Sequence, residues 1–407
     1  MRCTSSPWSY RSGIVGAGAS FRRSAYSGVV AEPFAVQALA TGGAADQIAR
    51  ALVERLAAPG LQIAFVFADH RLDPAVLAQT QRALSAPVVG CTTTGALGPG
   101  TVHTGEPAAV ALGLYGEGVR VGVGVAPELS KAALVRSSEA VHRAAVALGT
   151  TAEALDPGRH VAITLVDGCC DHEEAFCIGS AASAPKIRFV GGAASTNLDE
   201  DNRTYVWANG EVLSDAGIVV VLDSEQPFHA VTSSHLVATE LRTVVTAASG
   251  RVIDELDGRP AAPRLRQLVA TLGDVLDEPR PTHSFARYID GVPYVRSLHR
   301  VAGDRLLLAS AVETGHILHV MRPGDMIRIT MRDLATAAER VGGSMAAFLA
   351  FSCIGRHAEA AIRGTASDLA AAYGAYPTVG FQTLGEQSGM LLLNHTLTGL
   401  AIGAPKP

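Results

Sequence analysis

The chain has 407 residues and a formal net charge of -5, with 48% hydrophobic and 17% charged residues. This composition excludes a disordered chain, and the length excludes one ordinary core and favours two domains of roughly 150–200 residues each. No cluster of Lys and Arg with interleaved aromatic residues indicates a nucleic-acid partner, and no apolar run approaches the roughly 20 residues that a membrane span needs.

The N-terminal stretch carries several arginines among serines but lacks the continuous apolar centre of a secretory signal. We therefore expect residues 1–30 to form a loose extension rather than a targeting segment. The chain has six cysteines, which at this length make no disulfide framework. This usage favours a reducing, cytoplasmic compartment.

The first predicted unit begins with an apolar run over residues 61–68, which indicates a buried strand because turn signals follow it. Asp73 and Pro74 are typical of a helix N-cap and first helical position, and Pro87 ends that helix. A short strand then leads into the small-residue loop Gly90-Cys91-Thr92-Thr93-Thr94-Gly95.

The same order of elements returns twice. In the second unit, a strand over 161–166 and a helix over 171–182 lead to a strand that enters the loop 191–196. In the third unit, a strand over 347–351 and a helix lead to the loop 380–386. Three strand–helix–strand units that each end in a loop of small residues predict an internal structural repeat.

Strand-rich stretches lie between the units, with Asn209-Gly210 as the clearest hairpin turn. A helix beginning at Gly258-Arg259-Pro260 marks the expected start of the second domain, which gives domains over residues 31–255 and 256–400. The sequence therefore predicts an α/β fold of layered mixed sheets covered by helices, in two domains with repeated strand–helix–strand units.

Short motifs follow one another over most of the chain, and each is weak alone. They occupy residues 87–95, 166–168, 173–176, 189–194, 294–297, 351–356, 380–386 and 394–398. Taken in this order, the motifs resemble those of the FIST family, whose members join a FIST N and a FIST C domain.

The resemblance implies a sensory protein that binds a small ligand, with amino acids among the proposed ligands. It also implies an alternative, since some bacterial relatives resemble haem-binding nitric oxide sensors that control a histidine kinase. No kinase, cyclase or DNA-binding segment is recognisable in the sequence, so we expect signalling to a separate protein such as a histidine kinase. No P-loop or dinucleotide fingerprint occurs in the right context, so nucleotide cofactors are not predicted.

Arg356 and Glu386 are the charged residues that we expect to hold the ligand. Arg356 lies in the first turn of a predicted helix, where a cation is electrostatically disfavoured, and a ligand carboxylate would explain its presence. Glu386 ends the returning strand of the same unit, and parallel strands place these two ends at one edge of the sheet. The alternative is a structural ion pair, of Arg356 with Glu386, Glu359 or Asp290.

The small-residue loops are expected to line the same site, because ligands of open α/β sheets bind where strands end and helices begin. Small residues also let a ligand approach the backbone. The alternative is that Gly and Thr serve only tight turns. The predicted loop contacts are Cys91, Thr92, Thr93, Ser195 and Thr196.

Cys353 precedes a predicted helix, where the helix dipole favours a thiolate, and His357 follows one turn later. This pair is the strongest enzyme signal in the chain, but no third orienting group is evident. We therefore include Cys353 among the ligand-site residues and expect a protein that is not an enzyme, with a Cys-dependent enzyme as the alternative.

Two further groups bear on metals and haem. One Cys/His-rich stretch matches no standard zinc spacing, so neither a metal nor an obligatory cofactor is predicted; it contains Cys169, Cys170, His172 and Cys177. Any haem would be non-covalent and would need an axial histidine in an apolar pocket. We take His395 as the first candidate, and the others are His235, His283 and His357.

Overall fold

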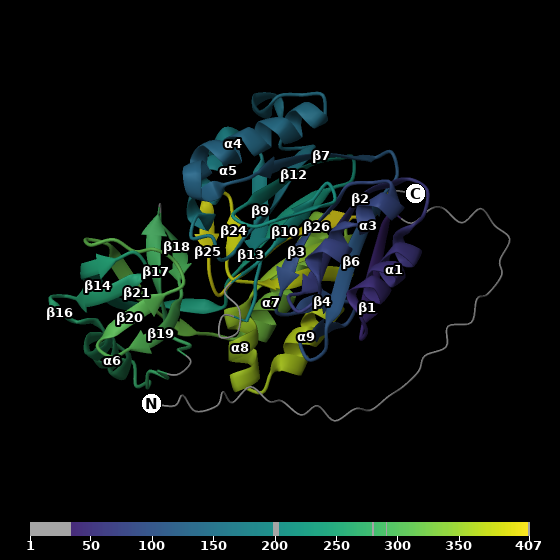
Figure 1. Cartoon of the computed structure of the whole chain (residues 1–407). Helices are drawn as coiled ribbons and strands as arrows, with labels where there is room; N and C mark the ends of the chain where they lie inside the picture. The colour runs from purple at the N-terminus through teal and green to yellow at the C-terminus, as the bar shows by residue number, and fades with distance from the viewer. Residues whose placement is uncertain (1–33, 198–202, 279–280, 290, 406–407) are drawn as a thin grey trace, which may run out of the picture.

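The structure is a computed structural model that describes residues 34–197, 203–278, 281–289 and 291–405. The extension expected over residues 1–30 lies outside these ranges. Figure 1 shows a core of three sheets with helices on the outside, and a smaller sheet with its own helix beside it. None of the helices in the described ranges is long and apolar enough to cross a membrane.

The three sheets of the core have six strands each and share one plan. Two parallel strands at the centre are flanked by two antiparallel strands on one side and by a short hairpin on the other. The first sheet runs β1 (Ala35–Thr41), β6 (Ala108–Tyr115), β2 (Leu61–Asp69), β3 (Val88–Thr93), β10 (Val206–Ala208) and β11 (Glu211–Leu213). The second runs β7 (Val119–Ala126), β12 (Gly217–Ser224), β8 (His160–Val166), β9 (Arg188–Ala193), β24 (Glu386–Ser388) and β25 (Leu391–Leu393). The third runs β13 (Phe228–Ser233), β26 (Leu397–Gly403), β22 (Met345–Cys353), β23 (Thr378–Thr383), β4 (Ala96–Gly98) and β5 (Thr101–His103).

The expected internal repeat is confirmed by the register of the central strand pairs. Gly90, Gly191 and Gly380 each sit opposite a residue of the preceding parallel strand, namely Val66, Thr164 and Ala350. A Cβ atom on these three glycines would lie 1.8, 2.1 and 1.9 Å from the carbonyl oxygen of that residue. The backbones approach so closely that only glycine fits, and the same fit recurs once in each unit.

The hairpins are exchanged between units, which closes the three sheets into a ring. The hairpin β10–β11 follows the second unit in the chain but pairs with β3 of the first. The hairpin β24–β25 follows the third unit but pairs with β9 of the second, and β4–β5 of the first unit pairs with β23 of the third. The N-terminal and C-terminal parts of the chain are therefore interlocked.

Alternate residues of each central strand face opposite sides, as strand geometry requires. One face of all three sheets contributes to a common core, represented by Phe65, Ile163 and Leu349. The opposite faces are covered by helices: α1 (Ala45–Leu56), α2 (Pro74–Ala78) and α3 (Thr80–Leu84) on the first sheet, α4 (Leu129–Ala147) and α5 (Glu173–Ser183) on the second, and α7 (Met326–Arg340), α8 (Ile354–Ile362) and α9 (Ala366–Gly374) on the third. A short 3₁₀ turn, η1 (Ala152–Ala154), follows α4.

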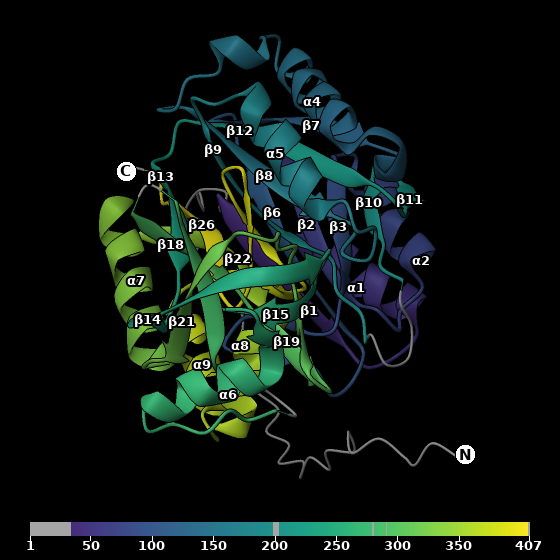
Figure 2. The same ribbon diagram turned by 90° about the vertical axis from the view of Figure 1, so that its left-hand side faces the viewer.

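The smaller sheet is built from residues between β13 and α7 and has its own apolar core with α6 (Ala261–Thr271). Its strands are β14 (Leu236–Ser249), β15 (Val252–Leu256), β16 (Arg259–Pro260), β17 (Ser284–Ile289), β18 (Val292–Arg296), β19 (Leu298–Ala302), β20 (Arg305–Leu308) and β21 (Ile317–Pro323). Figure 2, turned toward this sheet, shows β14, β15 and β21 in front of the core. The predicted boundary between residues 255 and 256 falls inside this sheet, where β15 pairs with β16.

Several predicted helices differ in extent from the observed ones. The helix expected after Asp73 is divided into α2 and α3, although Asp73 does cap α2 through a bond from the Ala75 N–H. The helix expected after Cys353 is divided into α8 and α9, with Gly364 at a φ of +69° between them. Left-handed backbone of this kind ends helices.

Candidate ligand-binding site

The three small-residue loops meet at the ends of the central strands. The Thr93 hydroxyl donates to the Gln382 carbonyl oxygen at 2.9 Å, and the Thr94 N–H donates to the Ser195 hydroxyl at 3.0 Å. Ser195 also donates to the Gln382 carbonyl. The loops of all three units therefore converge, since the Thr93 and Ser195 hydroxyls both donate to the same Gln382 carbonyl oxygen.

The other predicted loop residues lie around this junction with different roles. Cys91 is fully buried in the common core, and burial raises the pKa of its thiol. Thr92 fixes the backbone by accepting a bond from the Tyr205 N–H at 3.0 Å. The hydroxyl of Thr196 is buried without a hydrogen-bond partner in the part of the chain that the structure describes, which is uncommon for a buried polar group.

Glu386 is fully buried at the start of β24, beside the residue that ends β22. Thr383 and Thr396 donate their hydroxyls to its two carboxyl oxygens, and the Thr396 N–H adds a bond of 3.2 Å. Burial nevertheless raises the pKa of Glu386 to about 7, although these hydrogen bonds act in the opposite direction. The carboxyl group is thus close to half ionised at neutral pH, in reach of the Cys353 thiol.

Arg356 is also fully buried, in the first turn of α8 as predicted. Its Nη2 donates to the Thr330 hydroxyl at 2.6 Å, and its Nη1 lies 3.4 Å from His235 Nδ1, while its Nε has no hydrogen-bond partner. The expected ion pair of Arg356 with Glu386 is not formed among the described residues, because each side chain bonds to other groups. Arg356 instead belongs to a series of buried polar residues that includes His235 and Glu359.

That series centres on Glu359, which accepts two imidazole N–H groups. His235 Nε2 and His395 Nε2 each lie 2.9 Å from the same oxygen, Glu359 Oε2. Burial opposes ionisation of Glu359, but the hydrogen bonds from both histidines outweigh it and hold the carboxyl pKa below its usual value. Burial lowers the pKa of His235, so the imidazole is neutral and the carboxylate is charged.

Arg363 balances that charge, since its Nε lies 2.9 Å from Glu359 Oε1. Glu359 was considered from the sequence only as a partner for Arg356, yet it contacts Arg363 directly and Arg356 only through His235. The spacing of Arg356 and Glu359, three residues apart, does place both on one helix face. Thr330 was not singled out from the sequence, whereas Ser297, whose hydroxyl lies 3.4 Å from His395 Nδ1, ends the motif over residues 294–297.

His395 does not fit the role of axial haem ligand. Its Nε2 lies 2.9 Å from Glu359 Oε2 and its Nδ1 lies against Ser297, so both ring nitrogens are engaged by protein groups. The ring is 96% buried among polar neighbours rather than in an apolar pocket. His235 is engaged at both nitrogens in the same way.

The thiol groups show no sign of activation. Burial, followed by the nearby Glu386 carboxyl, raises the pKa of Cys353, which disfavours the thiolate that a nucleophile needs. The expected base, His357, bonds instead to the Ser352 hydroxyl at 3.0 Å. Burial also raises the pKa of Cys169 to about 11.

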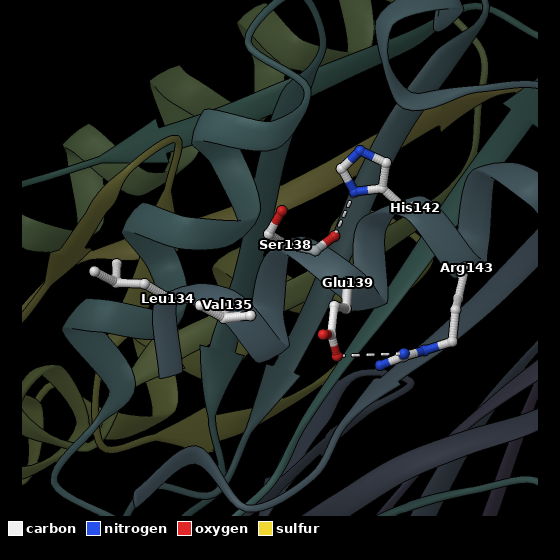
Figure 3. Close-up of a pocket in the computed structure, with 6 residues that line it drawn as sticks. All are labelled: Leu134, Val135, Ser138, Glu139, His142 and Arg143. Carbon is white, nitrogen blue, oxygen red and sulfur yellow. Dashed lines mark hydrogen bonds and ion pairs between the residues drawn. The ribbon is translucent and has the colours of Figure 1, made fainter. Parts of the chain in front are cut away.

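Two shallow hollows lie on the surface, and neither is lined by a residue of the predicted site. Figure 3 shows the one on α4, where the His142 ring lies against the Ser138 carbonyl and Arg143 reaches back to Glu139. Its other lining residues are Leu134 and Val135. The second lies on the smaller sheet and is lined by Ala238, Thr239, Glu240, Arg242, Tyr288 and His319.

Comparison with known proteins identifies the two halves of the chain. Residues 62–259 match the FIST N domain, and residues 261–389 match the FIST C domain. Among curated proteins none matches the sequence. A solved structure of cyanuric acid hydrolase from A. caulinodans aligns with 92% of this chain and 100% of its own at 13% identity, with a TM-score of 0.34. PurLQS from Thermotoga maritima aligns with 92% of this chain and 74% of its own at 12% identity, with a TM-score of 0.19. The two domain matches cover most of the chain, which therefore belongs to the FIST family.

Proposed function

We propose that this protein is a sensory module that binds a free amino acid between Arg356 and Glu386 without catalysing a reaction. FIST domains are linked to sensory signalling and small-ligand binding, and the two residues supply the chemistry. The observation that carries the proposal is that a buried guanidinium and a buried carboxyl each lack an ion-pair partner among the described residues.

A buried charge without a partner is costly, so a ligand that neutralises it gains affinity. The carboxylate of an amino acid matches the guanidinium of Arg356, whose Nε offers a donor that no group of the described residues accepts. The ammonium group matches Glu386. Binding would draw Arg356 away from His235, which lies between the core and the smaller sheet.

That displacement supports a route for the signal. His235 occupies the short link between β13 and β14, so a change at Arg356 alters the contact that joins the two parts of the molecule. A ligand shifts such an equilibrium by its difference in affinity for the two states. The altered surface would be recognised by a separate signalling protein, such as a histidine kinase.

The proposal is tested by adding each common amino acid to the purified protein and measuring the thermal midpoint, then the affinity of each hit by calorimetry. A ligand at a hundred times its dissociation constant stabilises the fold by about 2.7 kcal/mol. Replacing Arg356 by Met is expected to abolish binding. Arg328→Met is the matched control, because Arg328 is an exposed residue of the neighbouring helix α7.

Arg356→Lys covers the case in which the Met variant does not fold. Lysine keeps the charge but loses the bidentate geometry, so binding should weaken by about tenfold or more. Normal binding by either Arg356 variant, or no response of the wild-type protein to any amino acid, would rule out this site.

Affinity should also depend on pH in a way that identifies Glu386. The ammonium group binds the ionised carboxylate, and the pKa of Glu386 in the unliganded protein is about 7. Below pH 7 the proton must leave on binding, so affinity should fall about tenfold per pH unit, and above pH 7 it should level off. Glu386→Gln should bind weakly at every pH, and a wild-type affinity that is flat between pH 5.5 and 8 would contradict the role of this carboxyl.

A further inference from the structure

Three donor atoms of the buried network are arranged as ligands of a metal ion. His235 Nε2, His395 Nε2 and Glu359 Oε2 lie within 4.8 Å of one another, and all three residues are buried. Each imidazole nitrogen is 2.9 Å from the carboxylate oxygen. Two donors at about 2.1 Å from one ion lie about 3 Å apart at the right angle of octahedral coordination and about 3.4 Å apart at a tetrahedral angle. The observed spacing matches octahedral coordination as well as hydrogen bonding, and a tetrahedral ion would need the donors to move apart slightly.

The donors come from three separate parts of the chain. His235 lies in the link between β13 and β14, Glu359 on α8, and His395 in the turn between β25 and β26. His395 has a φ of +59°, a left-handed backbone conformation that residues other than glycine rarely adopt. Gly355 faces its ring, and a Cβ atom there would come 3.1 Å from His395 Nδ1. The backbone is therefore shaped to hold this imidazole against Glu359.

Groups behind two of the donors suit a metal-bound state. A ligating histidine commonly donates its second N–H to an oxygen, and the Ser297 hydroxyl lies 3.4 Å from His395 Nδ1. The second oxygen of Glu359 lies 2.9 Å from Arg363 Nε in an ion pair, without the geometry of a hydrogen bond. Both contacts orient the donors toward the point that the three atoms share.

The third donor, His235, can bind a metal only if its imidazole proton moves and Arg356 changes position. Metal binding at Nε2 moves the imidazole proton of each histidine to Nδ1, so no proton is released overall. At His395 the moved proton can be donated to Ser297. At His235 it would face Arg356 Nη1, which is itself a donor at 3.4 Å, so Arg356 must turn away.

We propose that His235, His395 and Glu359 form a binding site for one divalent first-row transition ion. Two imidazoles and one carboxylate are the donor set of many zinc sites and of non-haem iron(II) sites. Calcium and magnesium are excluded by their preference for oxygen donors. The metal donors are not the residues of the amino-acid proposal, and the metal needs no organic ligand, but both proposals move Arg356 away from His235.

The test is a titration of the tag-free, chelator-treated full chain with Co²⁺, followed by displacement with Zn²⁺, in the absence of amino acids. We expect one Co²⁺ per chain, with a visible spectrum that lacks thiolate charge transfer. His395→Ala and Glu359→Gln should each weaken binding by about 100-fold or more, and Ser297→Ala by about tenfold. A double variant, Cys169→Ser with Cys170→Ser, is the matched control and should bind as the wild-type protein does.

The outcomes separate the proposal from its competitors. Absence of stoichiometric Co²⁺ and Zn²⁺ binding by the wild-type protein overturns the site, even where a variant fails to fold. Loss of binding in the double cysteine variant, or a thiolate band in the wild-type spectrum, also overturns it by placing the ion at the Cys/His-rich stretch. The proposed site is also overturned if the His395→Ala variant folds and binds Co²⁺ with the affinity of the wild-type protein.

Discussion

Glu386 is a residue whose buried environment opposes its ordinary charge state. Its pKa rises to about 7 because of burial, whereas an unfolded glutamate titrates near 4.3. Because the pKa is higher in the folded state, the contribution of Glu386 to the free energy of unfolding is complete below its pKa in the unfolded chain. That contribution is lost as pH rises to its pKa in the folded protein. Between about pH 4.5 and pH 7 this group should therefore remove on the order of 3 kcal/mol of stability.

Comparison with Glu386→Gln isolates this effect from the other titrating groups. The free energy of unfolding, measured in urea without ligand, should fall from pH 5 to pH 7.5 more steeply in the wild-type protein than in the variant. The glutamine amide still accepts one of the threonine bonds, so the variant should fold. Parallel pH profiles for the two proteins would show that Glu386 titrates normally.

Cys353 provides a second test at the residue scale, directed at the alternative of a thiol enzyme. It is 5% exposed, and burial raises its pKa, so alkylation of the native protein should be much slower there than at the half-buried Cys169 and Cys170. In urea all the cysteines should react alike. Rapid, pH-dependent labelling of Cys353 alone would favour the enzyme instead.

The sequence predicted the components of this site better than their connections. Arg356 and Glu386 were predicted from their positions beside apolar strands, and both are fully buried at those positions. The ion pair between them that was the alternative is not formed among the described residues, because Thr330 and His235, which lie 26 and 121 residues from Arg356, take its donors. Such contacts depend on how α7 and the link before β14 meet α8, which no local pattern encodes.

At the scale of the elements, the glycine in the second strand of each unit is the clearest mark of the repeat. Gly90, Gly191 and Gly380 meet backbone oxygens at about 2 Å when a Cβ atom is added. Replacing any of them by alanine should destabilise the protein by roughly 1–3 kcal/mol or more, because the parallel strands must separate. Thermal or urea unfolding of the three variants should give similar losses.

Gly105→Ala is the matched control for this series. Gly105 has no atom within 4 Å of an added Cβ and no left-handed φ, so its replacement should change stability by less than about 0.5 kcal/mol. A repeat glycine that tolerates alanine as well as Gly105 does would show that its unit is not built like the others.

The strands of each unit could be predicted because long apolar runs bounded by turn residues have few other interpretations. The exchange of hairpins between units could not be predicted from the sequence. The turn Asn209-Gly210 was expected to join two strands, and it does join β10 to β11, yet nothing in those residues indicates that β10 pairs with β3, more than a hundred residues earlier. Pairing partners are selected by the whole assembly, which short motifs do not describe.

At the scale of the whole molecule, two ways of dividing the chain are present. The family models meet at residues 259 and 261, close to the predicted boundary at 255 and 256. The backbone instead groups residues 236–323 as one sheet with α6, and joins residues on both sides of that sheet into a ring. Sequence families thus divide the chain at a point where β15 and β16 pair with one another.

The exchanged hairpins predict that the two family domains do not fold separately. A fragment over residues 34–259 lacks β24, which pairs with β9, and leaves β4 without β23. A fragment over residues 261–405 lacks β13, the neighbour of β26, and β14, the neighbour of β21. Each fragment would expose unpaired strand edges and part of the common core, a state prone to aggregation.

Expression of each fragment alone should therefore give insoluble or non-cooperatively unfolding material, whereas co-expression should restore a complex that purifies as one species. The intact chain should show one calorimetric transition for the ring, because each unit supplies strands to two sheets and its removal leaves both incomplete. The FIST N fragment is the decisive one, since it contains two of the three units. If it unfolds alone with a sharp transition and native-like secondary structure, the hairpins are accessory, and the ring is not the folding unit of this protein.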